Sequence, residues 1–362
     1  MVDQKIIFAC AVAMATSAVA LIVLIRIAKP LSLIDLPDHR KHHRGSIPLV
    51  GGLAILIGAL SGMWVLSRFD RFELMLLWTS ALLLIVGVQD DRRDVSVRTR
   101  LLVQTGAILL MIVSTGVYVR TLGGGVELGW LGVPFTVLAV IGLLNAFNLM
   151  DGIDCLAGSL ALVSIIALLL LSGANPTQGT AALLLLLACA LAPFLLSNGG
   201  LFGARWKCFL GDSGATLLGY MLAWTLIEFS QTGSTSLTPT ATLWCVALPV
   251  MDTCAVMYRR LREGRSPFKP GNGHIHHLLV GAGLSPRVAV IVLIAFAIAM
   301  ALLGAFVRWL HLGVGSNIVA FCVLMIAYIS ISTHMYVRQR SPAFRRDHPE
   351  RIPSSAKGDM AA

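Results

Sequence analysis

Long stretches that carry no Asp, Glu, Lys or Arg constrain the fold of this chain more than any other feature. A helix needs about 20 apolar residues to cross a bilayer. Backbone groups in lipid must pair within their own segment, and the runs are too long for barrel strands, so we expect helices. We predict eleven transmembrane spans, in the charge-free runs 6–25, 45–67, 74–89, 101–119, 128–150, 155–204 (crossing twice), 213–227, 229–251, 288–307 and 309–333.

Composition agrees with an all-α, polytopic membrane protein. Hydrophobic residues make up 57% of the 362-residue chain and charged residues only 13%. A soluble domain carries about 25% charged residues, because its surface meets water. A soluble enzyme, a disordered chain and a disulfide-rich secreted domain are therefore excluded. The seven cysteines show no C-x-x-C spacing, and cysteines in apolar stretches behave as small hydrophobes.

The distribution of basic residues predicts the orientation. An odd number of spans places the termini on opposite sides, and Lys and Arg mark the cytoplasmic side. With the N-terminus outside, 23 of the 28 Lys and Arg become cytoplasmic, which explains the net charge of +10 without nucleic acid. We predict one transmembrane domain over 1–337 and a polar, disordered cytoplasmic tail over 338–362. The predicted cytoplasmic loops are 26–46, 90–100, 145–155, 198–213 and 258–287.

Acidic and amide side chains gather in loops of the same side, although only Lys and Arg were used to orient the chain. Asp90 and Asp91 end one span. Adjacent helical side chains diverge by about 100°, so one carboxylate faces a site while the other supports it. The alternative is a solvated pair neutralised by the arginines that follow. Asp212 precedes another span, where it either caps the helix or offers a carboxylate to a metal beside an anion-binding helix end.

Asn145, Asn148, Asp151 and Asp154 recur every three residues at the end of another span. Residues three apart share a helix face, so we expect Asn148 and Asp151 to converge, with Asn145 and Asp154 diverging. Four such groups at a membrane boundary are costly unless they are used or paired. Helix termination by Asn and Asp is the alternative.

A histidine cluster follows a flexible Pro-Gly-Asn-Gly segment, with His274, His276 and His277 close together. No cysteine lies nearby, and the Asp and Asn groups suit a hard, oxygen-liganded ion such as Mg²⁺ better than zinc. We expect the histidines to form hydrogen bonds or exchange protons with phosphate; a plain surface loop is the alternative. Basic residues around the acids are what phosphate chemistry needs, although topology and anionic lipid headgroups explain many of them.

Five segments together resemble the polyprenyl-phosphate N-acetylhexosamine-1-phosphate transferases, which belong to glycosyltransferase family 4. The matching segments are Asp90-Asp91, NAFNLMDGID (145–154), LGDSG (210–214), and SPFKP followed by HIHH in 266–277. They occur in order over roughly residues 33–285. The HIHH segment is similar to the bacterial subgroup that transfers N-acetylglucosamine 1-phosphate to undecaprenyl phosphate, rather than to the peptidoglycan branch.

The resemblance implies a role for each of these residues. It implies Mg²⁺, or Mn²⁺ in its place, held by Asn148 and Asp212, and attack of a lipid phosphate on the β-phosphorus of a UDP-sugar with release of UMP. The residues that it implies for catalysis are Asp90, Asp91, Asp151, Asp154 and His276. Those implied for substrate binding are Lys41, Arg100, Asn145, Arg265, His274 and His277.

Three positions depart from the family pattern. Cys155 stands where a Gly is usual, Ala215 replaces a Ser, and Gly271-Asn272-Gly273 replaces a more polar stretch. The last change lies in the loop that we expect to read the sugar. Another UDP-N-acetylhexosamine, such as UDP-QuiNAc or UDP-FucNAc, is therefore the alternative donor to UDP-GlcNAc.

The expected function is the first membrane step of O-antigen or other cell-envelope polysaccharide synthesis. We expect the chain in the bacterial inner membrane with its active site toward the cytoplasm, in contact with anionic lipid and without nucleic acid; a homodimer stays open. An ion-coupled transporter is the alternative from another class, but transporter sites lie near the bilayer midplane, whereas these acids lie at helix ends.

Overall fold

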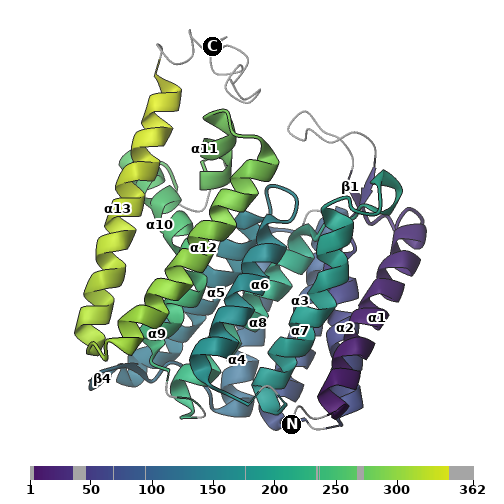
Figure 1. The fold of residues 1–362 in the computed structure, drawn as a ribbon, viewed down its shortest axis with the longest axis horizontal. Helices are drawn as coiled ribbons and strands as arrows, with labels where there is room; N and C mark the ends of the chain where they lie inside the picture. Colours follow the sequence, from purple (N-terminus) through teal and green to yellow (C-terminus); the bar gives the residue numbers. More distant parts are fainter. Residues whose placement is uncertain are drawn as a thin grey trace.

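A computed structural model describes residues 4–35, 46–67, 69–93, 95–175, 177–233, 235, 237–266 and 273–341. These residues form a helical bundle with two short hairpins (Figure 1). The long helices are α1 Gln4–Ile27, α2 Gly51–Leu66, α3 Arg71–Arg93, α4 Val97–Thr115, α5 Gly132–Met150, α6 Leu156–Ser172, α7 Gly179–Asn198, α8 Gly211–Gln231, α10 Ala247–Arg262, α12 Pro286–Trp309 and α13 Val314–Arg340.

The short elements lie between these helices. They are the β1 (Ile34–Asp35) and β2 (Ile47–Pro48) pair, the β3 (Thr121–Gly123) and β4 (Val126–Glu127) pair, η1 Gly129–Leu131, η2 Ala204–Trp206, α9 Pro239–Thr242, η3 Leu243–Val246 and α11 Ile275–Gly281. The all-α membrane fold predicted from the apolar runs is confirmed.

Every predicted apolar run contains a helix, and the long run 155–204 holds two, α6 and α7. Eight helical segments are long and apolar enough to cross a membrane, and α2 and α6 are shorter apolar helices. The number of helices that cross a membrane, and the orientation, stay predictions. One boundary was wrong: α8 continues through Glu228 to Gln231, because Glu228 lies within the last turn and does not interrupt the backbone hydrogen bonds.

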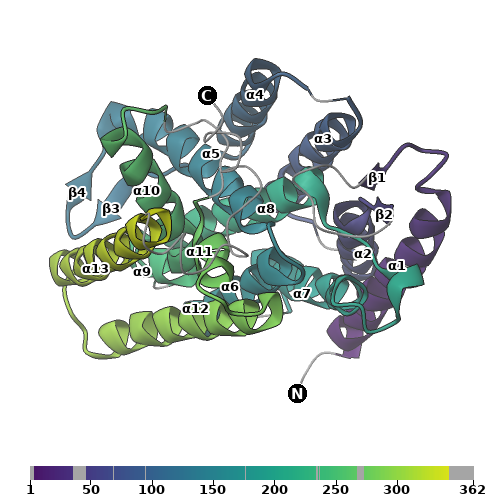
Figure 2. The same ribbon diagram turned by 90° about the horizontal axis from the view of Figure 1, so that it is seen from above.

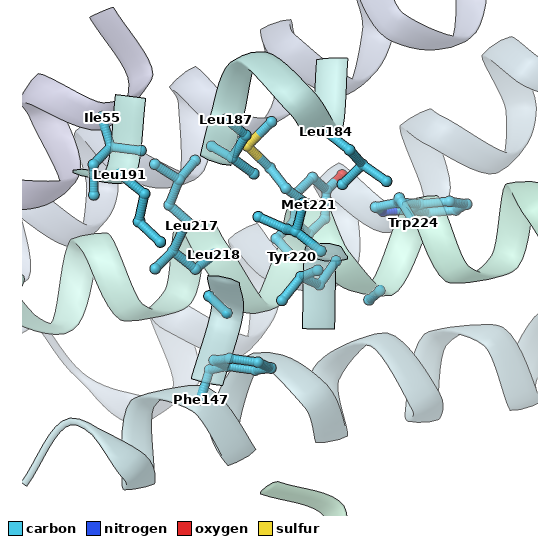
Figure 3. Close-up of a cluster of buried hydrophobic side chains, with 14 of the residues drawn as sticks. Ile55, Phe147, Leu184, Leu187, Leu191, Leu217, Leu218, Tyr220, Met221 and Trp224 are labelled. Carbon is cyan, nitrogen blue, oxygen red and sulfur yellow. The ribbon is translucent and has the colours of Figure 1, made fainter. Parts of the chain in front are cut away.

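Helix α8 forms the centre of the bundle, surrounded by α2, α3, α5 and α6 (Figure 2). Sixteen of its 21 residues are buried. Its side chains pack against those of the helices around it, as the cluster in Figure 3 shows for Leu217 near Leu191, Met221 near Leu187 and Trp224 near Leu184. The helix that carries Asp212 is thus fixed on every side by protein.

Exposed tryptophans mark one membrane boundary. Trp64 lies in the last turn of α2, Trp78 in the second turn of α3, Trp130 in η1 and Trp309 at the end of α12, each more than two thirds exposed. These helix ends lie at the end of the bundle where α1 begins (Figure 1). Tryptophan favours the headgroup level of a bilayer, so this ring fits a membrane interface.

The polar helix ends lie at the opposite end of the bundle, where α3 and α5 finish, α8 begins and α11 sits (Figure 1). The hairpin β1–β2 joins this face, and Phe209, just before α8, bonds to Pro48 and Gly51 through its backbone. Helix α13 continues to Arg340, three residues beyond the predicted end of the transmembrane domain at 337, and residues 342–362 lie outside the described part.

Candidate active site

A pocket opens between α3, α4, α5 and α8 at the polar end of the bundle. Its polar lining brings together residues that the sequence analysis selected on four separate helices. Those residues are Asp90, Arg100, Asn145, Asn148 and Asp212. Its other walls are mostly apolar side chains of α3 and α4, including Leu83, Val86, Val97, Leu101 and Val103. A polar end joined to an apolar wall suits a ligand that is both charged and lipid-like.

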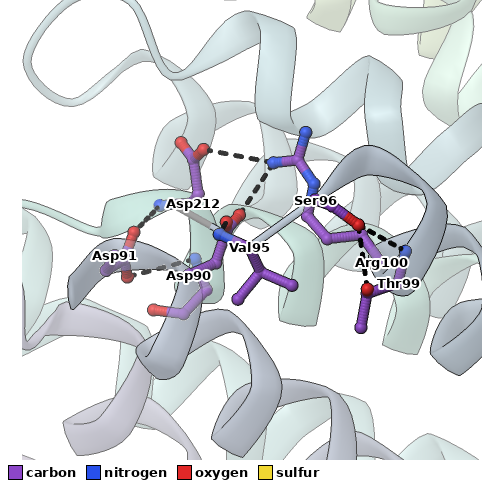
Figure 4. A network of polar contacts seen from close by, with 8 residues as sticks. Asp90, Asp91, Val95, Ser96, Thr99, Arg100 and Asp212 are labelled. Carbon is purple, nitrogen blue, oxygen red and sulfur yellow. Dashed lines mark hydrogen bonds and ion pairs between the residues drawn. The ribbon is translucent and has the colours of Figure 1, made fainter. Parts of the chain in front are cut away.

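Asp90 holds Arg100 at the pocket (Figure 4). One Asp90 oxygen accepts a hydrogen bond from the Arg100 guanidinium at 2.7 Å, and the other accepts the backbone N–H of Val95 at 2.7 Å. Ser96 caps α4 by accepting the N–H of Thr99, which starts the helix one turn before Arg100. The Arg100 guanidinium also lies 3.9 Å from the carboxylate of Asp212. Asp90 therefore fixes a positive charge beside the acids.

Asp91, near the end of α3, caps the N-terminus of α8. Its carboxylate accepts the backbone N–H groups of Asp212 and Ser213, at 3.2 and 3.4 Å, from the first turn of α8 (Figure 4). Leu210 occupies the N-cap position of α8 and provides no side-chain cap. Of the two roles left open for Asp212, capping is thus performed by Asp91. The Asp212 side chain, 56% exposed, lines the pocket instead.

Glycines allow this close contact between helices. A Cβ on Gly52 would lie 2.4 Å from the Cα of Gly214, and one on Gly87 would lie 2.6 Å from the Cα of Ser213. Gly211 begins α8 with φ +75°, a conformation that side chains rarely adopt. The motif around Asp212 is glycine-rich because α2 and α3 pack directly on the backbone there.

The side chain of Asn148 has a buried oxygen. Its Oδ1 has no hydrogen-bond partner among the described residues, and the side chain lines the pocket that Asp212 also lines. Buried polar atoms in native proteins are nearly always paired, so an orphan needs an explanation such as an absent ion. Asn145, one turn earlier, also lines the pocket, while its amide donates to the carbonyl of Ile141 at 2.8 Å.

Asp151 follows the last residue of α5 and lies among other acids. Burial raises the pKa of its carboxyl to about 8, with further contributions from the negative charges of Asp212, Asp91 and Asp154. Four carboxylates from three segments are therefore close enough to repel one another. Such a cluster disfavours full ionisation, and a bound cation would relieve the repulsion.

Asp154 points to a different partner. Its carboxylate forms an ion pair with Lys207 at 2.6 Å, and Asn198 accepts the neighbouring backbone N–H of Cys155 at 2.5 Å. These contacts join the turn 151–155 to the end of α7, through Asn198, and to the segment before α8, through Lys207. Asp154 thus contacts Lys207, whereas Asn145 lines the pocket; α5 ends at Met150, so the helical spacing does not extend to Asp154. Cys155 adopts a left-handed φ of +65°, which accounts for the glycine usual at this position in the resembling family.

His274 is the N-cap residue of α11, and His276 and His277 lie in its first turn. His276 brings this helix against the turn 151–155. His276 is buried, and a Cβ on Gly152 would lie 2.1 Å from its Nε2. Neither ring nitrogen of His276 has a hydrogen-bond partner within the described part of the chain. Burial lowers the pKa of His276 to about 2, with further contributions from His277 and His274, so the ring is neutral near pH 7. The ring of His277 lies tilted by 37° to that of His276, with the ring centroids 4.1 Å apart.

Of the predicted substrate-binding residues that the structure describes, Arg265, His274 and His277 do not line the pocket. Arg265 pairs with Glu263 and donates to the hydroxyl of Tyr336 at 3.1 Å. Lys41 lies outside the described residues, as do residues 267–272 of the loop before the histidines.

Two residues of this region were missed by the sequence analysis. Asp252 is fully buried in α10 and contacts His274, and Lys207 pairs with Asp154. An acid at the end of the apolar run 229–251 was a usable signal for Asp252. For Lys207 the sequence offered only one basic residue among many.

Comparisons with known proteins agree with this geometry. The family model for glycosyl transferase family 4 matches residues 73–230, which include the acid cluster. Proteins named undecaprenyl-phosphate alpha-N-acetylglucosaminyl 1-phosphate transferase are similar along most of the chain. The protein from Escherichia coli K12 is 36% identical over 79% of each chain. The protein from Yersinia pestis is 37% identical over 77% of this chain and 78% of its own. For Haemophilus influenzae the identity is 35%, over 87% and 91%. This chain therefore belongs to glycosyl transferase family 4.

Proposed function

We propose that this protein transfers N-acetylglucosamine 1-phosphate from UDP-GlcNAc to undecaprenyl phosphate and releases UMP. The observation that carries the proposal is the buried Oδ1 of Asn148, which has no hydrogen-bond partner in the described part of the chain, in a pocket that Asp212 and Arg100 also line. An amide oxygen, a carboxylate and a guanidinium on one pocket suit a metal-bound diphosphate. The relatives' names support the two substrates, and the family supports the reaction class.

The donor groups in the pocket fit Mg²⁺. Asn148 and Asp212 would hold the ion through oxygen atoms, the ligands that a hard divalent cation prefers. When bound, the ion neutralises phosphate oxygens and so stabilises charge that develops on them. Asp91 contributes by fixing the start of α8, so Asp212 keeps its place before any ion arrives.

The chain's own residues would position the two phosphates. An oxygen of the lipid phosphate attacks the β-phosphorus, and the bond from this phosphorus to the bridging oxygen breaks, leaving the electron pair on UMP. A phosphate monoester with its second pKa near 6 is largely ionised at neutral pH, so the transfer needs no obligatory base. Arg100, held by Asp90 at 2.7 Å, would bind phosphate oxygens. Positioning and charge neutralisation are the main contributions in such transfers.

The acceptor would approach along the apolar wall of the pocket. Leu83 and Val86 of α3 and Leu101 and Val103 of α4 border the polar end, and Leu101 is 41% exposed. An isoprenoid chain lying on these residues would leave its phosphate beside Arg100. This placement also fits an inner-membrane protein whose pocket faces the cytoplasm, where UDP-sugars are made.

A second donor remains a candidate because of one sequence observation. The Gly271-Asn272-Gly273 segment departs from the more polar family pattern just before the histidines. A looser loop suits another UDP-N-acetylhexosamine, such as UDP-QuiNAc or UDP-FucNAc.

The test combines a substrate panel with two ligand variants. Purified protein with undecaprenyl phosphate should release UMP from UDP-GlcNAc, and EDTA should stop release until Mg²⁺ is restored. Asn148→Ala and Asp212→Asn should each lower the rate more than about 100-fold, as expected when a preorganised electrostatic contact is removed. Release from UDP-QuiNAc alone would transfer the proposal to the second donor.

Asn175→Ala, in the connection between α6 and α7 at the other end of the bundle, is the matched control and should keep wild-type activity. Mg²⁺ should also raise the melting temperature of wild type but not of Asp212→Asn. Equal stabilisation of both proteins would refute the metal assignment, whatever the activities.

A further inference from the structure

A buried carboxylate supports the histidine segment from behind. Asp252 of α10 is 0% exposed, and its Oδ2 lies 2.8 Å from Nδ1 of His274. Its Oδ1 accepts the backbone N–H of Ile275 at 3.0 Å and the hydroxyl of Tyr328, from α13, at 3.0 Å. Asp252 thus joins α10, α11 and α13 at the residue that begins the HIHH sequence.

These contacts determine which nitrogen of His274 faces away from Asp252. A carboxylate that receives an amide N–H and a hydroxyl O–H acts as an acceptor, so Nδ1 of His274 carries a proton and donates it. The remaining ring nitrogen, Nε2, is buried and has no partner among the residues that the structure describes. A carboxylate that accepts from one nitrogen of an imidazole fixes both the tautomer and the orientation of the ring. The contact with Asp252 therefore determines that His274 presents Nε2 on its other side.

The same segment is tied down at a second point. Arg259, also buried, donates to the carbonyl of Gly273 at 2.6 Å and to the hydroxyl of Ser332 at 2.9 Å. The rings of His274 and His276 stack nearly parallel, with centroids 5.9 Å apart, and His276 rests against Gly152 of the acid cluster. The orientation of His274 is therefore defined relative to the turn that carries Asp151.

We propose that Asp252 is a positioning residue of the transferase, which holds His274 so that Nε2 meets the sugar diphosphate donor. This inference rests on the proposed function. Asp252 touches no substrate and acts only through His274, with Tyr328 fixing its second oxygen. The last helix, α13, thereby contributes to donor binding although it lines no part of the pocket between α3, α4, α5 and α8.

A double-mutant cycle separates this role from general support of the fold. Asp252→Asn, His274→Ala and the double variant are compared by UMP release, with UDP-GlcNAc and undecaprenyl phosphate titrated separately. Asp252→Asn should lower kcat/KM for the nucleotide sugar by about 10- to 100-fold, in the range found for partners that orient a ligand histidine. The KM for the lipid should stay unchanged. The double variant should be no worse than His274→Ala, because coupled residues are non-additive.

Two further variants keep the test decisive. Tyr328→Phe removes one of the three hydrogen bonds to Asp252 and should lower kcat/KM for the nucleotide sugar by about five-fold. It should have no effect in the His274→Ala background. This second cycle replaces the first if Asp252→Asn does not fold. Asn317→Ala is the matched control. Asn317 accepts a buried hydrogen bond from Trp244 at 2.6 Å, so its loss should lower the melting temperature and leave both KM values unchanged.

Additive losses in both cycles, or a defect shared equally by the two substrates, would overturn the inference. Failure of the proposed function would look different, because wild type itself would release no UMP. Calorimetric binding of UDP-GlcNAc without lipid gives the same comparison independently of turnover. Equal affinity of wild type and Asp252→Asn in that measurement would also overturn it.

Discussion

A methyl group added at Gly152 should separate the histidine segment from the acid cluster. The new Cβ would lie 2.1 Å from Nε2 of His276, whereas ordinary contact begins near 3.4 Å. The ring or the turn must therefore move by about 1.3 Å. His276 is 1% exposed, its ring stacks on that of His274 and it contacts the tilted ring of His277, so the ring has little room to rotate. The strain falls on α11 and on the turn that carries Asp151.

The size of the effect follows from this displacement. A misplacement of about 1 Å in a catalytic arrangement costs on the order of 100-fold in rate, so Gly152→Ala should reduce kcat for UMP release by about that factor. Overpacking of this kind costs about 1–3 kcal/mol of folding free energy, which leaves a folded protein. Gly152 has no left-handed φ, so backbone strain does not contribute.

Gly142→Ala, in the helix α5 that precedes the turn, is the control, because its added Cβ would meet no atom within 4 Å. It should keep full activity and gain up to about 1 kcal/mol from the better helix former. In a His276→Ala background, the stability loss caused by Gly152→Ala should vanish. If Gly152→Ala turns over within three-fold of wild type, the contact between α11 and the turn does not matter for the reaction.

Three further results are expected. Lys207→Met and Asp154→Asn should lower UMP release equally, and together no further, because their contact at 2.6 Å acts as one unit; additive losses would contradict this. Cys155→Gly should raise the free energy of unfolding by about 0.5–1 kcal/mol, since a left-handed φ of +65° is strained for a side chain; a lower melting temperature would speak against it. Because the folded-state pKa of His276 is lowered to about 2, the unfolded chain alone gains its proton near pH 6.5. Stability should therefore fall by up to about 1.4 kcal/mol per pH unit below that value. Melting curves of His276→Gln should lose this slope, while those of the exposed His311→Gln keep it.

Hydropathy predicted the helices because lipid acts on every residue of a span in the same way. The bilayer requires long apolar runs whatever their neighbours are, so the ten runs appeared without knowledge of packing. The convergence of Asp90, Asn148 and Asp212 was predictable for a related reason. Basic residues place the loops on one side, and polar groups that share a side share a limited area.

Pairwise contacts were less accessible, because they depend on how helices pack. The sequence around Asp212 is compatible with a capping role, and only the approach of α3 shows that Asp91 takes that role. Asp252 adjoins an apolar run, and its partner is 22 positions away. The short helix α11 follows a glycine-rich segment, where local propensity is weak. These features arise from tertiary packing, which local sequence patterns do not encode.

The burial of α8 also bears on how the protein is made. This helix has 21 residues, yet it is not among the eight segments that are apolar enough to cross alone, because protein rather than lipid surrounds it. Insertion of a segment from the translocon depends on its own hydrophobicity. During synthesis α8 must therefore be retained by α2, α3, α5 and α6, which all precede it. Membrane insertion of α8 and the placement of Asp212 therefore depend on the same packing. A nascent chain with a faulty early helix would fail to insert α8 and would not form the surroundings of Asp212.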